Sequence, residues 1–184
     1  EFLPESEDLR SLLKEPGRAE EAEDKLRALE ASLASGEGEL RRGKRLFHEA
    51  TQREYDGVQQ LTQHAYDEAE KSFQSAFDRL ETATGVLAGR EPETLEKIRG
   101  LQEVVRTDLM NTYTASAEDL LRDGKNLASV RDFAQAIPML EQALGWAQKG
   151  EEYAEKQAME AWKEPEKELH ASVATTLDDA RLAY

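Results

Sequence analysis

The sequence predicts an all-α protein, and three observations carry this prediction. Strong helix formers (Ala, Leu, Glu, Lys, Gln and Arg) dominate nearly all of the 184 residues. Apolar residues recur at steps of three and four, as in Leu26, Leu29 and Leu33, which places them on one face of a helix. No segment alternates Val, Ile or Thr with polar residues, so strands are not expected.

Proline and glycine divide the chain sparsely and predict the first helix boundaries. Pro16 and Gly17 end a short first segment and open a helix that runs to about Leu33. Residues 35–38, Ser-Gly-Glu-Gly, form a turn-prone cluster. We expect this cluster to interrupt the helix and to cap the next one, which begins near Glu37.

The later boundaries rest on similar signals. Residues 89–92, Gly-Arg-Glu-Pro, predict the end of one helix and the start of another, with Pro92 in its first turn. Asp132 is expected to cap a helix that starts at Phe133, and Pro165 is expected to open the last helix. No Ser- or Pro-rich linker separates two halves, which favours a single domain over residues 1–184.

An internal repeat is the most informative feature of the sequence. In each copy an alanine is followed by a large apolar residue at +4 and a second alanine at +7, and a glycine precedes it by twelve residues. Small residues allow two antiparallel helices to approach closely, and the large residue fills the space beside them. The residues expected to pack in this way are Gly57, Ala69, Phe73 and Ala76 in the first copy and Gly124, Ala136, Leu140 and Ala143 in the second.

This pattern resembles the tetratricopeptide repeat, and residues 136–144 look particularly like the second helix of that repeat. The distance from Ala69 to Ala136 is close to two 34-residue units, so a degenerate unit is expected between them, at about 84–116. The resemblance implies antiparallel helical hairpins stacked as a solenoid with a concave surface. It also implies an N-terminal cap over 1–34, hairpins over 35–150 and capping helices over 151–184.

A second repeat competes with the first in register. Residues 35–46 match 116–127, and a three-residue gap then aligns Tyr55, Val58 and Ala65 with the second copy. A single long helix from about 37 to 88 would reconcile the two registers, because apolar positions continue through that span. Stacked short hairpins and a bundle of long helices therefore both remain open.

Composition excludes several functional classes. The chain has 24 Lys and Arg against 39 Asp and Glu, a net charge of −15, which argues against a nucleic-acid partner. Without cysteine it has no disulfides or thiol chemistry, and its apolar runs are too short to enter a bilayer as a span. Because the sequence begins with Glu1, we expect it to be a processed or trimmed part of a longer chain. Its compartment stays open: cytoplasmic, or extracytoplasmic after removal of a signal or anchor.

Motifs that would carry catalysis or bind a cofactor are incomplete. Gly38, Gly43 and Lys44 have the spacing of a phosphate loop, but Arg45 stands where Ser or Thr would hold magnesium. We expect Gly43 to pack against a helix and Lys44 to be solvated. His48 opens a zinc motif whose second histidine is missing. We therefore expect no enzyme activity, no cofactor and no metal.

Two basic clusters stand out in this acidic chain as candidate partner-binding residues. They occupy matching positions at helical i, i+3, i+4 spacing and would receive a carboxylate or acidic peptide. The alternative interpretation is a solvated face that pairs with neighbouring Glu residues. The two clusters are Arg41, Lys44 and Arg45, and Arg122, Lys125 and Asn126.

The sequence thus predicts a non-catalytic scaffold that binds a peptide or helix of a partner protein on a concave surface like that of tetratricopeptide repeats. The overall acidity favours a basic partner surface. Trp146 is expected to pack between hairpins. The alternative is a structural protein, a self-associating long-helix or coiled-coil spacer in a larger assembly, and a homo-oligomer remains open. A membrane-surface role is disfavoured by the negative charge.

Overall fold

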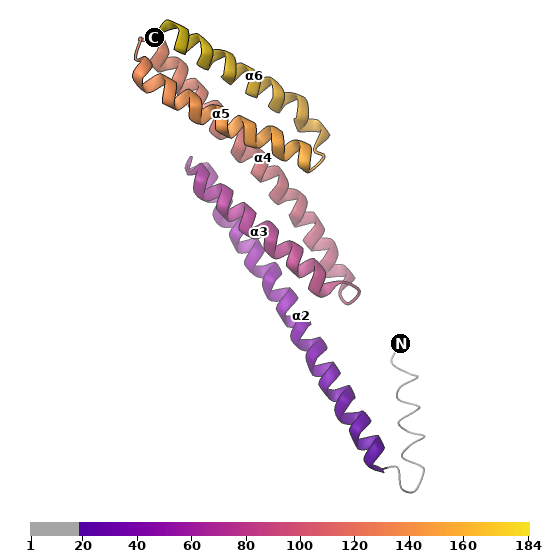
Figure 1. Ribbon diagram of the computed structural model, residues 1–184. Coiled ribbons are helices and arrows are strands. Elements are labelled where there is room, and N and C mark those ends of the chain that lie inside the picture. Colours follow the sequence, from indigo (N-terminus) through magenta and orange to yellow (C-terminus); the bar gives the residue numbers. More distant parts are fainter. Residues whose placement is uncertain (1–18) are drawn as a thin grey trace.

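The computed structural model describes residues 19–184, which form helices joined by short connections and contain no strand (Figure 1). The all-α class is therefore confirmed for this part of the chain. The helices are α2 (Ala19–Thr62), α3 (Tyr66–Leu87), α4 (Pro92–Ser129), α5 (Phe133–Lys156) and α6 (Glu160–Ala183).

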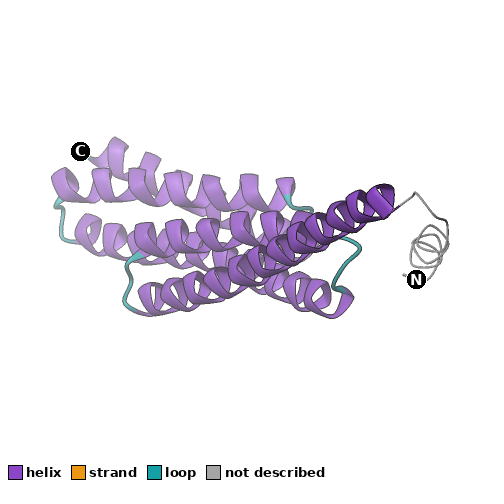
Figure 2. Ribbon diagram, turned by 90° about the horizontal axis from the view of Figure 1, so that it is seen from below, coloured by secondary structure: helices purple, strands orange, loops and turns teal. Residues whose placement is uncertain are grey.

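Each helix packs against the next one along the chain, and α4 also contacts α2 and α6. The α2–α3 hairpin covers the first half of α4, whereas α5 and α6 lie along its second half (Figures 1 and 2). One hydrophobic cluster accordingly forms mainly between α2, α3 and α4, with Ala154 of α5 also buried in it, and a second forms between α4, α5 and α6. Trp146 on α5 packs against both clusters.

The helices are longer than those of a short-hairpin repeat. They contain 22 to 44 residues, so α3 is about 33 Å long and α2 about 66 Å at 1.5 Å per residue. The degenerate unit expected at 84–116 is not a hairpin, because α4 is continuous from Pro92 onward. Residues 19–184 thus form five long helices packed against one another, an arrangement that fits a helical bundle or a helical repeat.

The predicted break at 35–38 is wrong, since α2 continues through it and past Leu33. Each glycine costs about 1 kcal/mol in a helix, but starting a new helix costs more because nucleation is unfavourable. The predicted boundaries at 34/35 and 150/151 lie inside α2 and α5. The boundary at Pro16–Gly17 falls outside the described residues.

Proline marks a different place in α6 than we predicted. The last helix begins at Glu160, and Pro165 is its sixth residue. Pro138 is likewise the sixth residue of α5. The first four N–H groups of a helix have no intrahelical partner, so a proline just beyond them removes only one hydrogen bond near the helix start.

Two predicted boundaries are confirmed. Helix α3 ends at Leu87, and α4 begins at Pro92. Asp132 caps α5, where its carboxylate accepts a hydrogen bond of 3.4 Å from the Gln135 backbone N–H.

Three connections share one backbone conformation. Residues 63–65, 130–132 and 157–159 each turn the chain between antiparallel helices with a central residue in the left-handed region. The central residues are His64, Arg131 and Ala158, with φ of 58°, 63° and 53°. This conformation costs a residue with a Cβ roughly 1–2 kcal/mol, whereas glycine adopts it freely.

The exposed connection at Arg131 offers a direct test of this cost. Replacing Arg131 with glycine is expected to raise the free energy of unfolding by about 1 kcal/mol, because the left-handed strain is relieved. The exposed Lys125, inside α4, provides the matched control. Lys125→Gly should lower stability by about 1 kcal/mol, since glycine is a poor helix former. Urea denaturation of both variants checks the opposite signs, and two losses would contradict the prediction.

The repeat pattern marks the contact between helices within each hairpin. All eight residues of the two copies are buried. A Cβ on Gly57 would lie 2.7 Å from the Phe73 ring, and a Cβ on Gly124 would lie 2.7 Å from the Leu140 side chain. Each glycine therefore forms the space into which a large side chain sixteen residues later inserts.

The packing follows the register that pairs Ala69 with Ala136. The competing register is wrong for residues 50–77, because it assigns core positions to Tyr55 and Val58, which are 55% and 39% exposed. The single helix over 37–88 is wrong as well, since the chain turns at 63–65. Gly43, the glycine of the competing register, packs against Leu87 instead.

A third copy of the glycine contact joins α5 to α6. A Cβ on Gly150 would lie 2.5 Å from the Glu166 carboxyl, again sixteen residues later in the chain. Glu166 is 1% exposed and thus occupies the position that Phe73 and Leu140 hold in the other two hairpins. The sequence pattern missed this copy because Trp162 and Leu169 replace the two alanines and a charged residue replaces the large apolar one.

Candidate functional site

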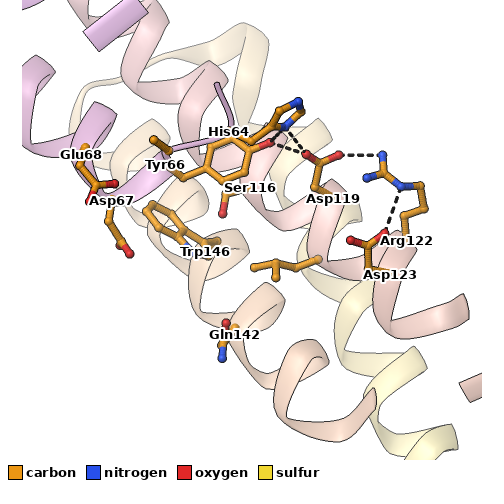
Figure 3. A pocket seen from close by; sticks show the side chains of 12 residues that line it. His64, Tyr66, Asp67, Glu68, Ser116, Asp119, Arg122, Asp123, Gln142 and Trp146 are labelled. Atoms are coloured by element: carbon orange, nitrogen blue, oxygen red, sulfur yellow. Dashed lines mark hydrogen bonds and ion pairs between the residues drawn. The ribbon is translucent and has the colours of Figure 1, made fainter. Parts of the chain in front are cut away.

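A hollow of about 540 Å³ lies where the α2–α3 connection meets the middle of α4 and α5. The connection and the start of α3 contribute residues 64–68, α4 contributes side chains between 116 and 123, and α5 contributes Gln142 and Trp146 (Figure 3). His64 and Tyr66 also line a second hollow of about 460 Å³ together with Trp162.

A polar network at one side of the hollow fixes the α2–α3 connection to α4. The Tyr66 hydroxyl donates a hydrogen bond to the Asp119 carboxylate. His64 Nδ1 lies 2.8 Å from the same carboxylate oxygen, and Arg122 Nη1 lies 2.7 Å from the other one (Figure 3). The left-handed conformation of His64 turns the chain so that both His64 and Tyr66 reach α4.

The network keeps its carboxylate ionised. Hydrogen bonds from Tyr66, His64 and Arg122 hold the pKa of Asp119 below its ordinary value. Burial, together with the bond to Asp119, raises the pKa of Tyr66, so this phenol stays a hydrogen-bond donor at neutral pH. Asp119 also raises the pKa of Arg122. The guanidinium of Arg122 is therefore already neutralised by a neighbour within the site.

Trp146 lines the opposite side of the hollow and belongs to a group of packed aromatic side chains. The Trp146 ring packs against Tyr113, with 6.0 Å between centroids, and Tyr113 meets Tyr153 edge to face at 5.6 Å. The Lys149 ammonium lies 4.2 Å from the Trp146 ring centroid, a cation–π contact. Burial raises the pKa of Tyr113, and burial raises that of Tyr153 to about 12. These phenols are neutral, so the charge beside the indole is that of the Lys149 ammonium.

Ser116 lies at the floor of the hollow, between Tyr66 and Trp146 (Figure 3). Its side chain is 1% exposed, and its hydroxyl oxygen has no hydrogen-bond partner. Buried polar groups in proteins are hydrogen-bonded in the large majority of cases, so a lone buried hydroxyl marks a position where a partner is missing. The hydroxyl can both donate and accept one.

The rim of the hollow is acidic. Asp67 and Glu68 are exposed in the first turn of α3, and within residues 19–184 neither forms an ion pair. Asp123 lies 3.4 Å from Arg122. The lining thus carries four carboxylates and a single guanidinium, which gives the hollow a negative potential.

The described residues of the hollow do not form an assembled serine–histidine–carboxylate triad. His64 and Asp119 form a pair like that of a hydrolase, but the hydroxyl of Ser116 is not hydrogen-bonded to the imidazole. Activation of a serine nucleophile needs that contact. The described residues contain no cluster of His, Asp or Glu side chains that could hold a metal ion. Nor does any helix of this part of the chain have the length and apolarity needed to cross a bilayer.

The first predicted basic cluster pairs with its own neighbours. Arg41 lies 3.4 Å from Glu37, Arg45 lies 3.5 Å from Glu49, and Lys44 Nζ lies 2.8 Å from Glu91. Hydrogen bonds from Lys44 and Thr94 lower the pKa of Glu91. The geometry favours the alternative interpretation of this cluster, an ion-paired surface.

The structure does not bring the two basic clusters together. Lys44 lies beside the start of α4 through Glu91, whereas Arg122 is about 45 Å further along α4 at 1.5 Å per residue. Arg122 belongs to the hollow, while Lys125 and Asn126 are exposed on the next turn of α4. The two clusters cannot contact one short peptide, because they lie too far apart. The sequence could not show this, since spacing along one helix gives no information on the distance between residues of two helices.

Most of the residues that line the hollow were not predicted from the sequence as site residues. His64, Asp119 and Ser116 belong to no functional motif, and Tyr66 lies three residues before the first alanine of the repeat. One signal was available, namely a cluster of polar and aromatic residues directly at a hairpin connection. Comparison of the chain with models of protein families, with curated proteins and with solved structures finds no match.

Proposed function

We propose that this protein is a non-catalytic interaction scaffold that binds a peptide or helix of a partner protein in the hollow between its α2–α3 and α4–α5 hairpins. The observation that carries the proposal is the composition of the hollow, in which the aromatic ring of Trp146, the unpartnered hydroxyl of Ser116 and the unpaired carboxylates of Asp67 and Glu68 face one space. The repeat pattern of the hairpins, similar to that of tetratricopeptide repeats, supports such a role.

The polarity of the hollow favours a protein partner over a small apolar ligand. Sites for small molecules are lined mostly by apolar groups with few polar ones. Here the rim is charged and only one wall, around Trp146, is aromatic. Protein interfaces combine such an aromatic centre with a polar rim. A protruding side chain of a bound segment would fill the hollow, and the segment would lie along α4 and α5.

Selection of peptides on the intact protein tests the proposal. We expect a displayed library of random peptides to yield binders whose affinity falls at least tenfold in the variant Gln142→Trp. Gln142 is exposed and lines the hollow, so an indole at this position would fill it. Surface plasmon resonance would measure both affinities.

The control is Gln148→Trp, an exposed site on the same helix outside the hollow. Binders should retain their affinity for this variant. A library that gives no binders, or binders equally sensitive to both variants, would argue against the proposal.

One observation favours the structural alternative as a second candidate. Helix α2 has twice the length of its partner α3, and its N-terminal half extends beyond the other helices (Figure 1). A long projecting helix is typical of a spacer that pairs with a second copy. Sedimentation equilibrium tests this role, because a spacer of this kind forms dimers at micromolar concentration. A monomer throughout the concentration range would exclude self-association.

A further inference from the structure

We infer that the hollow receives an arginine side chain of the partner protein. The inference rests on the proposed function and specifies the chemistry of the group that the hollow recognises. It follows from three features of the lining, namely its charge, its aromatic wall and its unpartnered hydroxyl.

The charge of the lining selects a cation. The guanidinium of Arg122 is held by Asp119 at 2.7 Å and by Asp123 at 3.4 Å, so it has no free charge to offer an anion. Asp67 and Glu68 have no such counterpart among residues 19–184. A carboxylate entering the hollow would be repelled, whereas a cation would be attracted. The acidic peptide predicted for Arg122 from the sequence does not suit this surface.

The aromatic wall is suited to the same kind of group. The Trp146 ring already has the Lys149 ammonium 4.2 Å from its centroid, and Glu70 holds that ammonium at 2.8 Å. The contact places one cation beside the indole. A planar guanidinium stacks on an aromatic ring better than the compact, strongly hydrated ammonium group does.

The third feature of the lining is the hydroxyl of Ser116. Its oxygen is buried without a partner beside Trp146 and can accept a hydrogen bond. A guanidinium carries five N–H donors in a planar fork, so it can donate to a hydroxyl and to carboxylates at the same time. Lysine could satisfy the charge, but its compact ammonium lacks the planar fork that lets a guanidinium stack on the indole and donate to the hydroxyl and the carboxylates together. These features together favour arginine.

A titration with single amino-acid derivatives tests the inference. The full chain, labelled with ¹⁵N, is titrated with Nα-acetyl-arginine amide and with the citrulline derivative, which has nearly the same shape without the charge. We expect the arginine probe to shift the Trp146 indole N–H and the Ser116 amide signals, with saturation in the millimolar range. The citrulline probe should bind at least tenfold more weakly, and the lysine derivative about threefold more weakly.

A pair of charge-matched variants locates the binding. Asp67→Asn combined with Glu68→Gln should weaken arginine binding at least threefold. Asp78→Asn combined with Glu81→Gln removes the same charge from exposed positions further along α3 and should leave the affinity unchanged. Equal binding of arginine and citrulline, or equal loss in both double variants, would overturn the inference.

The peptide selection distinguishes a failure of the arginine inference from a failure of the proposed function. If selected peptides depend on the hollow but an alanine scan shows that they need no arginine, the inference fails and the scaffold function stands. If no selected peptide depends on the hollow, the scaffold function fails, and the inference fails with it.

Discussion

A valine in place of Gly57 is expected to lower the free energy of unfolding by about 3 kcal/mol, the upper end of the usual cost of overpacking a core. Even a Cβ at this position would lie 2.7 Å from the ring of Phe73, which is fully buried between α2 and α3. In a chain of this size the loss corresponds to a fall in melting temperature of roughly 6–12 °C. Far-UV circular dichroism during heating and in urea would measure both.

The control for this substitution is Gly85→Val in α3. Gly85 is exposed, and a Cβ there would meet nothing within 4 Å. Valine and glycine differ only slightly in helix propensity, so the change in stability should stay within about 0.5 kcal/mol. A loss of similar size in both variants would mean that helix propensity, and not the contact with Phe73, limits stability.

A double-mutant cycle isolates the contact itself. Phe73→Ala alone should cost about 3–5 kcal/mol because it leaves a cavity. In the double variant the valine at position 57 would partly fill that cavity, so the combined loss should be at least about 1 kcal/mol smaller than the sum of the two single losses. Strict additivity would show that the two side chains do not meet.

The hairpin contacts could be predicted from the sequence because they are local in the chain. A three-residue connection between two antiparallel helices makes residues at similar distances from the turn face each other. Gly57 and Phe73 lie on either side of the connection at 63–65, and Gly124 and Leu140 on either side of that at 130–132. The small and large residues thus form a pattern at fixed spacing, and that pattern identified both contacts.

The hollow could not be predicted in the same way, since it depends on how one hairpin docks on the other. His64 meets Asp119 across 55 positions of the chain, and no spacing rule connects them. The hydrogen bond of the polar Gln60 is a second contact that could not be predicted from the sequence. Its place in the repeat is usually apolar, yet its side chain oxygen accepts a hydrogen bond of 2.7 Å from Ser72 on α3. Polar side chains that satisfy one another across a contact carry no periodic signal.

Local turn and proline signals predict the wrong limits for α2 and α6. Ser35, Gly36 and Gly38 favour a turn, but α2 continues through them as a single helix. Pro165 favours a helix start, but Gln157, Ala158 and Met159 form the turn before it. Helix α6 packs against α4 and α5.

Leucine in place of Glu166 is expected to stabilise the protein by about 1–3 kcal/mol at neutral pH, because it removes a buried charge that lacks a full set of partners. Glu166 lies against Gly150 between α4, α5 and α6. Thr114 donates a hydrogen bond to one of its carboxyl oxygens, while the other oxygen has no partner. Leucine occupies the equivalent position in the second hairpin, at Leu140, so the α5–α6 contact can accommodate it.

The dependence on pH distinguishes the charge from the change in packing. Burial raises the pKa of Glu166 above its ordinary value of 4.5; the hydrogen bond from Thr114 lowers it, and the neighbouring Glu118 and Glu151 raise it. Glu151 is itself paired with His170 at 2.6 Å. The folded protein thus binds the proton of Glu166 more tightly than the unfolded chain does. The stabilisation by this group is complete below the ordinary carboxyl pKa and is lost as the pH rises through the raised value.

Glu166→Gln keeps the shape and the acceptor for Thr114 but cannot ionise, so it should remove this loss of stability with rising pH. Its free energy of unfolding should match that of the wild type near pH 4 and exceed it near pH 7.5, by about 1.4 kcal/mol for each unit by which the pKa is raised. Glu168, exposed on α6, is the control, and Glu168→Gln should follow the wild type at both values. Urea denaturation across this range measures the difference. A constant offset between wild type and Glu166→Gln would show that Glu166 keeps its charge in the fold, and that α6 docks on α5 without binding a proton at this position.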